Sequence, residues 1–312
     1  MLHLDDLDIR IIREFNSPGP SQWNVRESFT AIARRLGVDE ETVRLRVARL
    51  RERGVFPALR IVVNPRLLGY EETGLDLEVE DESVKPEVLS RLRSAPGVIQ
   101  VADFQGPGLL AFLWHNRPDV VPWLRGWIDP IGAWRLRASW TSPFPEPTVK
   151  LRTIDWRILA AMRKDARMDL RTVASTARTT VRTVQRRLSA LKEGKAAFVI
   201  GTPNVDRTAG LVCNYLVYCP DTPRKRAADA AALRLLPRIG TSDSDSDHYS
   251  MFAGPCENLS QAEQGLAQLR ALYEVDSVRM AVVRQIYNPD DWLDGLLRER
   301  AQRAPGSHPT ER

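Results

Sequence analysis

Hydrophobic residues near the start of the chain recur in the same order in its second half. One set is repeated 147 residues later and a second set 141 residues later. The first set pairs Leu4, Leu7, Ile11, Ile12 and Phe15 with Leu151, Ile154, Ile158, Leu159 and Met162. The second set pairs Phe29, Ile32, Ala33, Leu36, Val43, Val47 and Leu50 with Leu170, Val173, Ala174, Ala177, Val184, Leu188 and Leu191. An internal repeat predicts two copies of one structural unit, with a longer loop around residues 17–20 in the first copy.

Each copy has the spacing of three short amphipathic helices, which predicts a helix-turn-helix. In the first copy we expect helices over residues 5–16, 29–36 and 39–53, because their apolar positions fall on one helical face. Gly37 is expected to end the second helix, and Asp39 to cap the third. In the second copy Thr180 is the expected cap of the third helix. A basic third helix after a tight turn suits the DNA major groove, and the alternative is a three-helix bundle with a solvated charged face.

The segment after each helical unit predicts strands. Residues 55–64 and 196–203 are each interpreted as a β hairpin, or wing. A β-α-β-β-α-β pattern follows in each copy, typical of a ferredoxin-like domain. Its elements are expected at 75–80, 84–94, 98–104, 109–115, 118–128 and 133–141, and again at 211–219, 223–236, 238–253, 258–273 and 276–286. We therefore predict an α+β fold in which two winged helix-turn-helix domains (1–64 and 149–205) alternate with two ferredoxin-like domains (65–148 and 206–300), before a disordered tail (301–312).

Charge is concentrated in the second helical unit. The net charge of the 312 residues is +5 and the mean hydropathy is −0.31. Residues 151–200 carry 12 basic and 4 acidic residues, so +8, whereas residues 1–60 carry 11 and 9, so +2. Residues 61–150 (−3) and 201–312 (−2) are mildly acidic. Basic units beside acidic ones predict a polyanion-binding head on a scaffold, and scattered surface charge is the alternative.

Several other classes of function are disfavoured by the residues. The start of the chain lacks an apolar stretch of signal-peptide length, and no apolar run is long enough for a membrane span. Three cysteines (Cys213, Cys219 and Cys256) give no disulfide framework, so a cytoplasmic location is expected. His3, His115, His248 and His308 have no metal-binding spacing, and Asp243, Asp245 and Asp247 only partly match a calcium loop. We expect no metal, no cofactor and no enzymatic activity.

The outward faces of the two third helices supply the candidate DNA-binding residues. At 100° per residue from the buried stripe, the outermost positions are Glu41, Leu45 and Ala48 in the first copy and Arg182, Arg186 and Ser189 in the second. Arg44 and Arg49 flank the first face, and Gln185 and Ala190 the second. Arginine and glutamine can read guanine and adenine, so the second helix has the better base-reading chemistry. For Arg46 and Arg187, which lie beside the buried stripe, a phosphate contact or an intramolecular ion pair is expected rather than a base contact.

These features together resemble a known family. The opening Leu-Asp-Asp-Leu-Asp-Ile-Arg-Ile-Ile (4–12), the third helix over 42–50, Gly54-Val55 and the following βαββαβ pattern are similar to the Lrp/AsnC regulators, as two tandem units. The resemblance implies a winged helix-turn-helix for double-stranded DNA and a βαββαβ domain that dimerises and often binds an amino acid. The chain departs from the family where Gly106 is followed by Pro107-Gly108-Leu109 without aspartate, and where residues 241–249 lack the glycine. Amino-acid binding is therefore not expected. Arg178 and Lys195 replace glycines, which predicts a distorted second unit.

The sequence thus predicts a transcription regulator that acts as a covalent pseudo-dimer on DNA, with an effector of unknown identity and further homodimerisation left open. Sirohaem decarboxylases look like the same two-unit architecture, and an enzyme of that type is one alternative. It would need a tetrapyrrole pocket to which only His115 and His248 could contribute histidines. A DNA-compacting protein is the other alternative. Trp134, Leu136, Ala138 and Trp140 are expected to share one strand face, and Trp123 and Trp127 one helix face; we favour packing over a ligand pocket for both groups.

Overall fold

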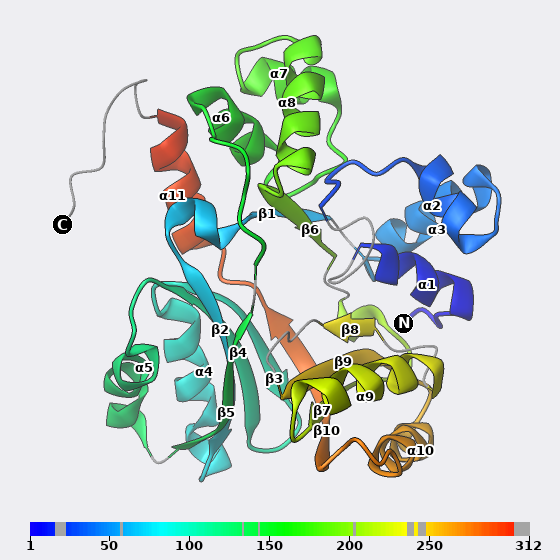
Figure 1. Cartoon of the computed structure of the whole chain (residues 1–312), viewed down its shortest axis with the longest axis vertical. Coiled ribbons are helices and arrows are strands. Elements are labelled where there is room, and N and C mark those ends of the chain that lie inside the picture. The colour runs from blue at the N-terminus through cyan, green and yellow to red at the C-terminus, as the bar shows by residue number, and fades with distance from the viewer. Residues whose placement is uncertain are drawn as a thin grey trace.

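The computed structural model describes residues 1–15, 23–56, 59–132, 134–142, 144–201, 204–235, 240–242 and 248–302. Two helical units lie above a strongly curved sheet whose outer surface is covered by helices (Figure 1). The predicted loop at 17–20, the aspartates at 243–247 and residues 303–312 fall outside the described residues. Among the described residues, no helix combines the length and the apolar character that a membrane span needs.

Each repeat begins with three helices, which we call the first head and the second head. The first head contains α1 (Asp6–Glu14), α2 (Phe29–Leu36) and α3 (Glu40–Glu52), and the second contains α6 (Thr153–Met162), α7 (Leu170–Thr176) and α8 (Val181–Glu193). The predicted caps are confirmed, because Asp39 accepts from the Thr42 amide at 2.7 Å and Thr180 accepts from the Thr183 amide at 3.2 Å. The predicted stripes of α3 and α8 are buried.

The second head keeps its turns although it lacks the expected glycines. Gly37 and Gly54 have φ angles of 71° and 68°, in the left-handed region that glycine adopts without penalty. Arg178 and Lys195 occupy the equivalent positions with φ angles of 55° and 51°. The backbone is therefore left-handed at both equivalent turns of the two heads, and the distortion predicted at these positions is wrong. The cost is backbone strain at two side-chain-bearing residues, about 1–2 kcal/mol each.

The strands that follow the heads pair with each other rather than forming separate hairpins. β1 (Arg60–Val63) lies antiparallel to β6 (Ala197–Ile200), with Arg60 opposite Ile200 and Val63 opposite Ala197. The hairpins predicted at 55–64 and 196–203 are thus replaced by one two-stranded sheet, apart from residues 57, 58, 202 and 203, which are not described. β1 follows the first head and β6 follows the second head. Each strand by itself would leave its backbone N–H and C=O groups without partners, and pairing the two strands satisfies the groups along their shared edge.

The two βαββαβ units form one antiparallel sheet of eight strands in the order β5-β2-β4-β3-β10-β7-β9-β8. The first unit contains β2 (Glu71–Val79), α4 (Lys85–Ser94), β3 (Val98–Phe104), β4 (Gly108–His115), α5 (Val120–Ile128) and β5 (Trp134–Ser142). The second contains β7 (Leu211–Tyr218), α9 (Thr222–Leu235), β8 (Gly240–Ser242), β9 (Tyr249–Cys256), α10 (Leu259–Arg270) and β10 (Ser277–Tyr287). Short 3-10 turns lie at Pro65–Leu68, Glu82–Val84, Asp129–Ile131 and Val205–Arg207. Each group of four strands has the ferredoxin-like order, and pairing of β3 with β10 joins them.

The two half-sheets also pack face to face. One side of each half-sheet is covered by its own helices, with separate cores under α4 and α5 and under α9 and α10. The opposite sides meet in a further apolar cluster that includes Phe104, Trp140, Leu216 and Met251. Trp140 stacks on Tyr249 with ring centroids 4.4 Å apart. The curvature of the sheet in Figure 1 therefore brings β5 and β9, which are not neighbours in the strand order, into contact.

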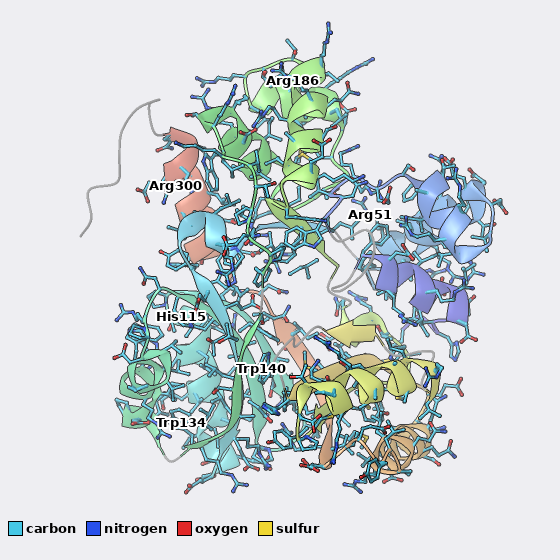
Figure 2. The ribbon with its side chains drawn as sticks, viewed as in Figure 1. Arg51, His115, Trp134, Trp140, Arg186 and Arg300 are labelled. Carbon is cyan, nitrogen blue, oxygen red and sulfur yellow. The ribbon has the colours of Figure 1, made fainter. Side chains whose placement is uncertain are left out.

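A bulge in β5 changes the predicted placement of the tryptophans. The pairing with β2 skips Arg137, so Asp76 lies opposite Ala138 and Leu77 opposite Leu136. The extra residue reverses the side to which later residues point. Trp134 consequently packs under the helices of the first half-sheet, and Trp140 packs against the second half-sheet (Figure 2). The prediction that both share one strand face is wrong, whereas Trp123 and Trp127 do stack on α5, with ring centroids 5.9 Å apart.

A final helix, α11 (Asp291–Gln302), returns to the second head and lies beside α6 (Figure 1). The sequence reading did not predict it, and it includes the first two residues of the predicted tail. Trp292 at its start packs edge-on against Tyr70 and Trp114, with centroids 5.5 and 6.4 Å away. Asp290 pairs with Arg60 of β1 and with Arg163 at the end of α6. The helix therefore ties both heads to the sheet.

Candidate nucleic-acid interface

The third helix of each head is fixed to the first helix by a buried carboxylate. Asp8 on α1 is fully buried, and its oxygens accept from Arg46, at 3.2 Å, and from Arg49 of α3. Arg46 also pairs with Asp5, which lowers the pKa of Asp5 against the opposing effect of its partial burial. An aspartate in the first turn of α1 thus positions α3 by charge-assisted hydrogen bonds.

The second head repeats this anchor at the equivalent residues. Asp155 on α6 is fully buried and accepts from Arg187 of α8 through two parallel bonds, Nε–Oδ1 at 2.5 Å and Nη2–Oδ2 at 2.7 Å. It also accepts from the backbone amide of Arg152 at 2.7 Å. Of the two roles expected for Arg46 and Arg187, the structure shows the intramolecular ion pair. Arg49, expected on the flank of the DNA face, is likewise engaged with Asp8.

The outward face of α8 carries exposed cationic and amide groups. Arg182, Gln185, Arg186 and Ser189 are all exposed. No carboxylate pairs with Arg182 or Arg186 within the described part of the chain. Figure 2 shows Arg186 at the outer end of the second head, away from the sheet. Ser189 donates to the carbonyl of Gln185 at 3.3 Å, so its hydroxyl is partly used within the helix. This face can therefore offer two guanidinium groups and one amide to a polyanion.

The outward face of α3 has different chemistry. Arg44 is paired with Glu40 and, at 3.2 Å, with Glu41 on the same helix, and its guanidinium lies 5.7 Å from the Phe29 ring. Leu45, at the centre of this face, is 61% exposed. The acidic residues of the first turn neutralise the single arginine that points outward. α3 therefore presents an apolar centre with little net charge, in contrast to α8.

The two heads share one core and are locked to each other. Arg26 of the first head donates to the carbonyls of Ala166 and Met168, at 2.9 and 2.6 Å, and Arg51 pairs with Asp165 at 2.8 Å. Arg167 lies over the Phe29 ring at 4.6 Å, and burial lowers the pKa of this guanidinium to about 10. The relative position of α3 and α8 is thus set within the chain. Sequence reasoning missed these contacts, because nothing local distinguishes these arginines from surface ones.

The hairpin expected to bear on amino-acid binding is occupied by a lysine. Gly106 has a φ angle of 78°, as a glycine turn requires. The buried ammonium of Lys85 donates to the carbonyls of Phe104 and Gly106 at 2.5 Å each, and lies 2.6 Å from Asp103. An internal cation therefore uses the Phe104 and Gly106 carbonyls of this hairpin as acceptors.

The two histidines considered for a tetrapyrrole site lie on different half-sheets. His115, on β4, is 2.7 Å from the Thr73 hydroxyl through Nε2 and 2.9 Å from the Arg117 carbonyl through Nδ1. His248, before β9, stacks on Tyr218 with centroids 6.1 Å apart. Within the described ranges, no group of three histidine, cysteine or carboxylate side chains has metal-binding geometry.

Comparison with known proteins bears on both the head and the whole architecture. The AsnC-type helix-turn-helix domain matches residues 4–51. Over 104 residues the chain is 35% identical to the HTH-type transcriptional regulator Ptr1 of Methanocaldococcus jannaschii, covering 33% of this chain and 66% of Ptr1. Over 60 residues it is 42% identical to the regulator LrpA of Pyrococcus horikoshii, covering 18% of this chain and 43% of LrpA. The chain thus spans less than two thirds of the length of these relatives.

Among solved structures, the chain is similar to the sirohaem decarboxylase NirDL, determined in complex with an iron-uroporphyrin III analogue. The TM-score is 0.52 at 15% identity, over 95% of this chain and 98% of that one. At this identity the likeness concerns the fold. The match over residues 4–51 and the two named relatives agree with each other, so the first head is an AsnC-type helix-turn-helix domain of the kind found in Lrp/AsnC regulators.

Proposed function

We propose that this chain is a cytoplasmic, sequence-specific transcription regulator that binds double-stranded DNA, with α8 as the main base-reading helix. The observation that carries the proposal is the exposed face of α8, where Arg182, Gln185 and Arg186 are open to solvent on a helix held by the Asp155–Arg187 pair. Arginine bonds guanine through two donors, and glutamine can bond adenine in the same way. Ser189 lies on the same face and would contact the backbone or a base edge.

The first head is proposed to bind beside it with a different preference. Leu45 can contact a thymine methyl group, whereas Glu41 can accept only from a base donor such as the cytosine amino group. Arg44 must leave its glutamate partners before it can reach DNA. Arg46, Arg49 and Arg187 keep the helices in place, and their outer edges would supply backbone contacts at most. The first head is therefore expected to add less affinity than the second.

The two heads are proposed to act as a covalent pseudo-dimer on an asymmetric site. Pairing of β3 with β10, the stack of Trp140 on Tyr249 and the pairing of β1 with β6 all occur within one chain. A homodimer uses one surface twice and reads a palindrome, whereas these halves have diverged and present unlike helices. We therefore expect two unlike half-sites at a fixed spacing. A homodimer of whole chains is compatible with this arrangement.

Selection from a random duplex library with the full chain tests the proposal. An asymmetric motif should be enriched, and affinity should fall steeply with salt because neutralised phosphates release counterions. The double variant Arg182→Ala, Arg186→Ala should lose about 30-fold or more in affinity, since two bidentate pairs at about 1–3 kcal/mol each contribute about 2–6 kcal/mol together. Arg44→Ala, on the outward face of α3, is the control variant and should lose less affinity for DNA. Equal or reversed losses at fixed salt would refute the assignment of α8.

Chromatin immunoprecipitation with sequencing separates the alternatives. A regulator should give discrete peaks, and a DNA-compacting protein should give broad coverage. The likeness in fold to NirDL makes the enzyme the other alternative, which predicts no enrichment on DNA but a Soret band after incubation with an iron tetrapyrrole. His115 and His248 already have contacts on separate half-sheets, so we expect no such band.

A further inference from the structure

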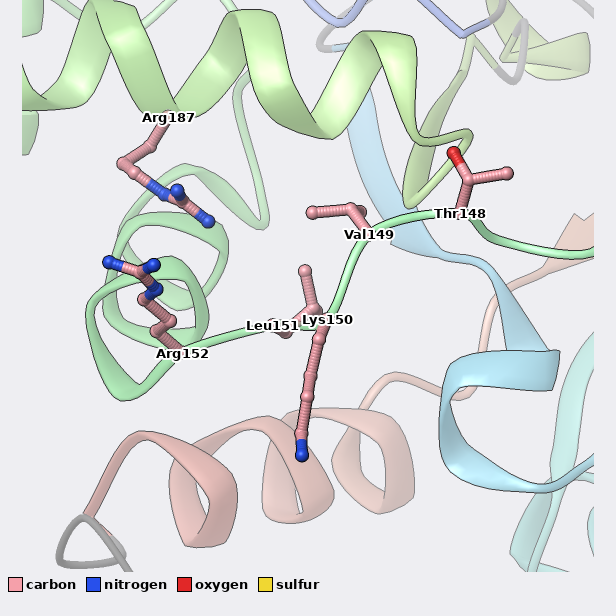
Figure 3. Close-up of a pocket in the computed structure, with 6 residues that line it drawn as sticks. All are labelled: Thr148, Val149, Lys150, Leu151, Arg152 and Arg187. Atoms are coloured by element: carbon pink, nitrogen blue, oxygen red, sulfur yellow. The ribbon is translucent and has the colours of Figure 1, made fainter.

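A pocket of about 430 Å³ opens between α8 and the segment that leads into α6. This segment links the first half-sheet to the second head. The pocket is lined by Thr148, Val149, Lys150, Leu151, Arg152 and Arg187 (Figure 3). It lies on the inner flank of α8, and its lining includes none of the outward residues assigned to base reading.

The walls of the pocket are held by the backbone. The Thr148 amide donates to the Gly194 carbonyl at 3.0 Å, and the Arg152 amide donates to Asp155. A Cβ added at Gly194 would lie 2.4 Å from Val149, so only glycine lets the linker approach the end of α8 this closely. The pocket is therefore part of the folded second head and needs no rearrangement to form.

Two guanidinium groups face each other inside this pocket. Figure 3 shows Arg187 descending from α8 and Arg152 rising from the linker toward it, while Lys150 extends toward α11. Arg187 uses Nε and Nη2 on Asp155, which leaves its Nη1 donors for another acceptor. No carboxylate in the described part of the chain pairs with Arg152. Like charges that face each other repel, and an anion placed between them would remove the repulsion.

The first head shows how the same position looks without such a site. Asp5 is the counterpart of Arg152, 147 residues earlier, and it closes the position by pairing with Arg46, the counterpart of Arg187. In the second head an arginine, Arg152, stands where the first head has the aspartate Asp5. Arg187 therefore faces a positive charge where Arg46 faces a negative one. The fold itself does not require a cation here, since the first head forms with an aspartate. The positive charge of the pocket is a property of the second copy alone.

We propose that this pocket binds a phosphate group between Arg152 and Arg187. Guanidinium groups match phosphate oxygens with paired donors, and the start of α6 adds the favourable end of a helix dipole. The phosphate can come from the DNA backbone or from a small phosphorylated molecule, which would make the second head a ligand-responsive element outside the sheet domains. Because free phosphate can be tested without DNA, the site stands or falls separately from the proposed regulator function.

Inorganic phosphate is the first probe, with the full chain at constant ionic strength and chloride as the balancing anion. Wild type should show a saturable rise in Tm. Arg152→Asp restores the first head's arrangement, with an N-cap aspartate that can pair with Arg187, so it should fold with an equal or higher Tm and lose the phosphate response. Lys164→Ala removes an exposed cation outside the pocket and should keep the response. The same response in Arg152→Asp and wild type would overturn the proposal.

The source of the phosphate is resolved by a salt titration of DNA binding with Arg152→Ala. If the DNA backbone fills the pocket, the slope of log K against log salt should fall by about 0.9, the contribution of one phosphate. If the slope is unchanged and free phosphate binds, a small phosphorylated ligand is the occupant. No phosphate response in wild type together with an unchanged slope would overturn the proposal.

Discussion

The anchor between α6 and α8 gives the sharpest test of how the second head is built. We consider Asp155→Ala, Arg187→Ala and the double variant. Asp155 is fully buried and the Arg187 side chain is 12% exposed, so either single change leaves a charge without its partner in a poorly solvated place. We expect each single change to cost about 3 kcal/mol, the lower end for buried pairs, because Arg187 borders an open pocket.

The double variant should cost much less than the sum of the two single changes. With both charges removed, what is lost is the bond to the Arg152 amide, worth about 1 kcal/mol as a cap, and the packing of the three methylene groups of the arginine stem, worth about 2–3 kcal/mol at about 0.8 kcal/mol each. We therefore expect a total of about 3–4 kcal/mol and a coupling energy of about 2–3 kcal/mol. The assay is native-state hydrogen exchange of the α8 amides, because it measures the opening of this head independently of the sheet.

Two comparisons make the result decisive. Arg186→Ala on the exposed face of α8 should change the opening free energy by less than about 0.5 kcal/mol. Arg46→Ala in the first head should cost less than Arg187→Ala, because Asp8 keeps its bond to Arg49, whereas Ala190 stands at the equivalent position of the second head. If the single costs add up in the double variant, or if Arg46→Ala costs more than Arg187→Ala, the anchor does not work as described.

Four further outcomes follow from the structure. Arg178→Gly should raise the free energy of unfolding by roughly 0.5–1 kcal/mol, because the strain relieved at a left-handed residue exceeds the entropic cost of glycine. If a urea titration shows a lower free energy of unfolding instead, the arginine side chain stabilises the turn. Burial raises the pKa of Glu72 above 4.5, although Trp114 donates to it, so its ionisation opposes folding as the pH rises. Glu72→Gln should therefore stabilise the protein at neutral pH, and the gain should vanish below pH 4.5, where wild type is protonated too; a gain that is equal at pH 4 and pH 8 in thermal melts would contradict this. Residues 1–150 expressed alone lack the partners of β1 and β3 and should aggregate or form a makeshift dimer; a stable, soluble monomer in light scattering would be inconsistent with the pseudo-dimer. The twenty amino acids at millimolar concentration should give no thermal shift, because Lys85 fills the hairpin; a saturable shift by any of them would place an amino-acid site elsewhere.

The sequence determined what depends on neighbours along the chain. Apolar spacing located the three helices of each head, and the caps Asp39 and Thr180 marked where the third helices begin, because helix formation and capping use residues within one or two turns. The repeat itself predicted that the second half would follow the first. The same register limited Arg46 and Arg187 to two roles, and only the tertiary structure showed that each arginine reaches an aspartate of the first helix of its head.

The tertiary structure decided what depends on edges and on distant partners. Whether residues 60–63 form a hairpin or join 197–200 depends on which edge is close, and the alternation of residues carries no information about that. The bulge at Arg137 placed Trp134 and Trp140 on opposite faces although their spacing predicts one face. The left-handed backbone at Arg178 is imposed by the packed helices on either side, which together outweigh its local preference. The local periodicity of apolar residues determines where helices and strands form. Which distant strands pair is decided by how much apolar surface each pairing buries.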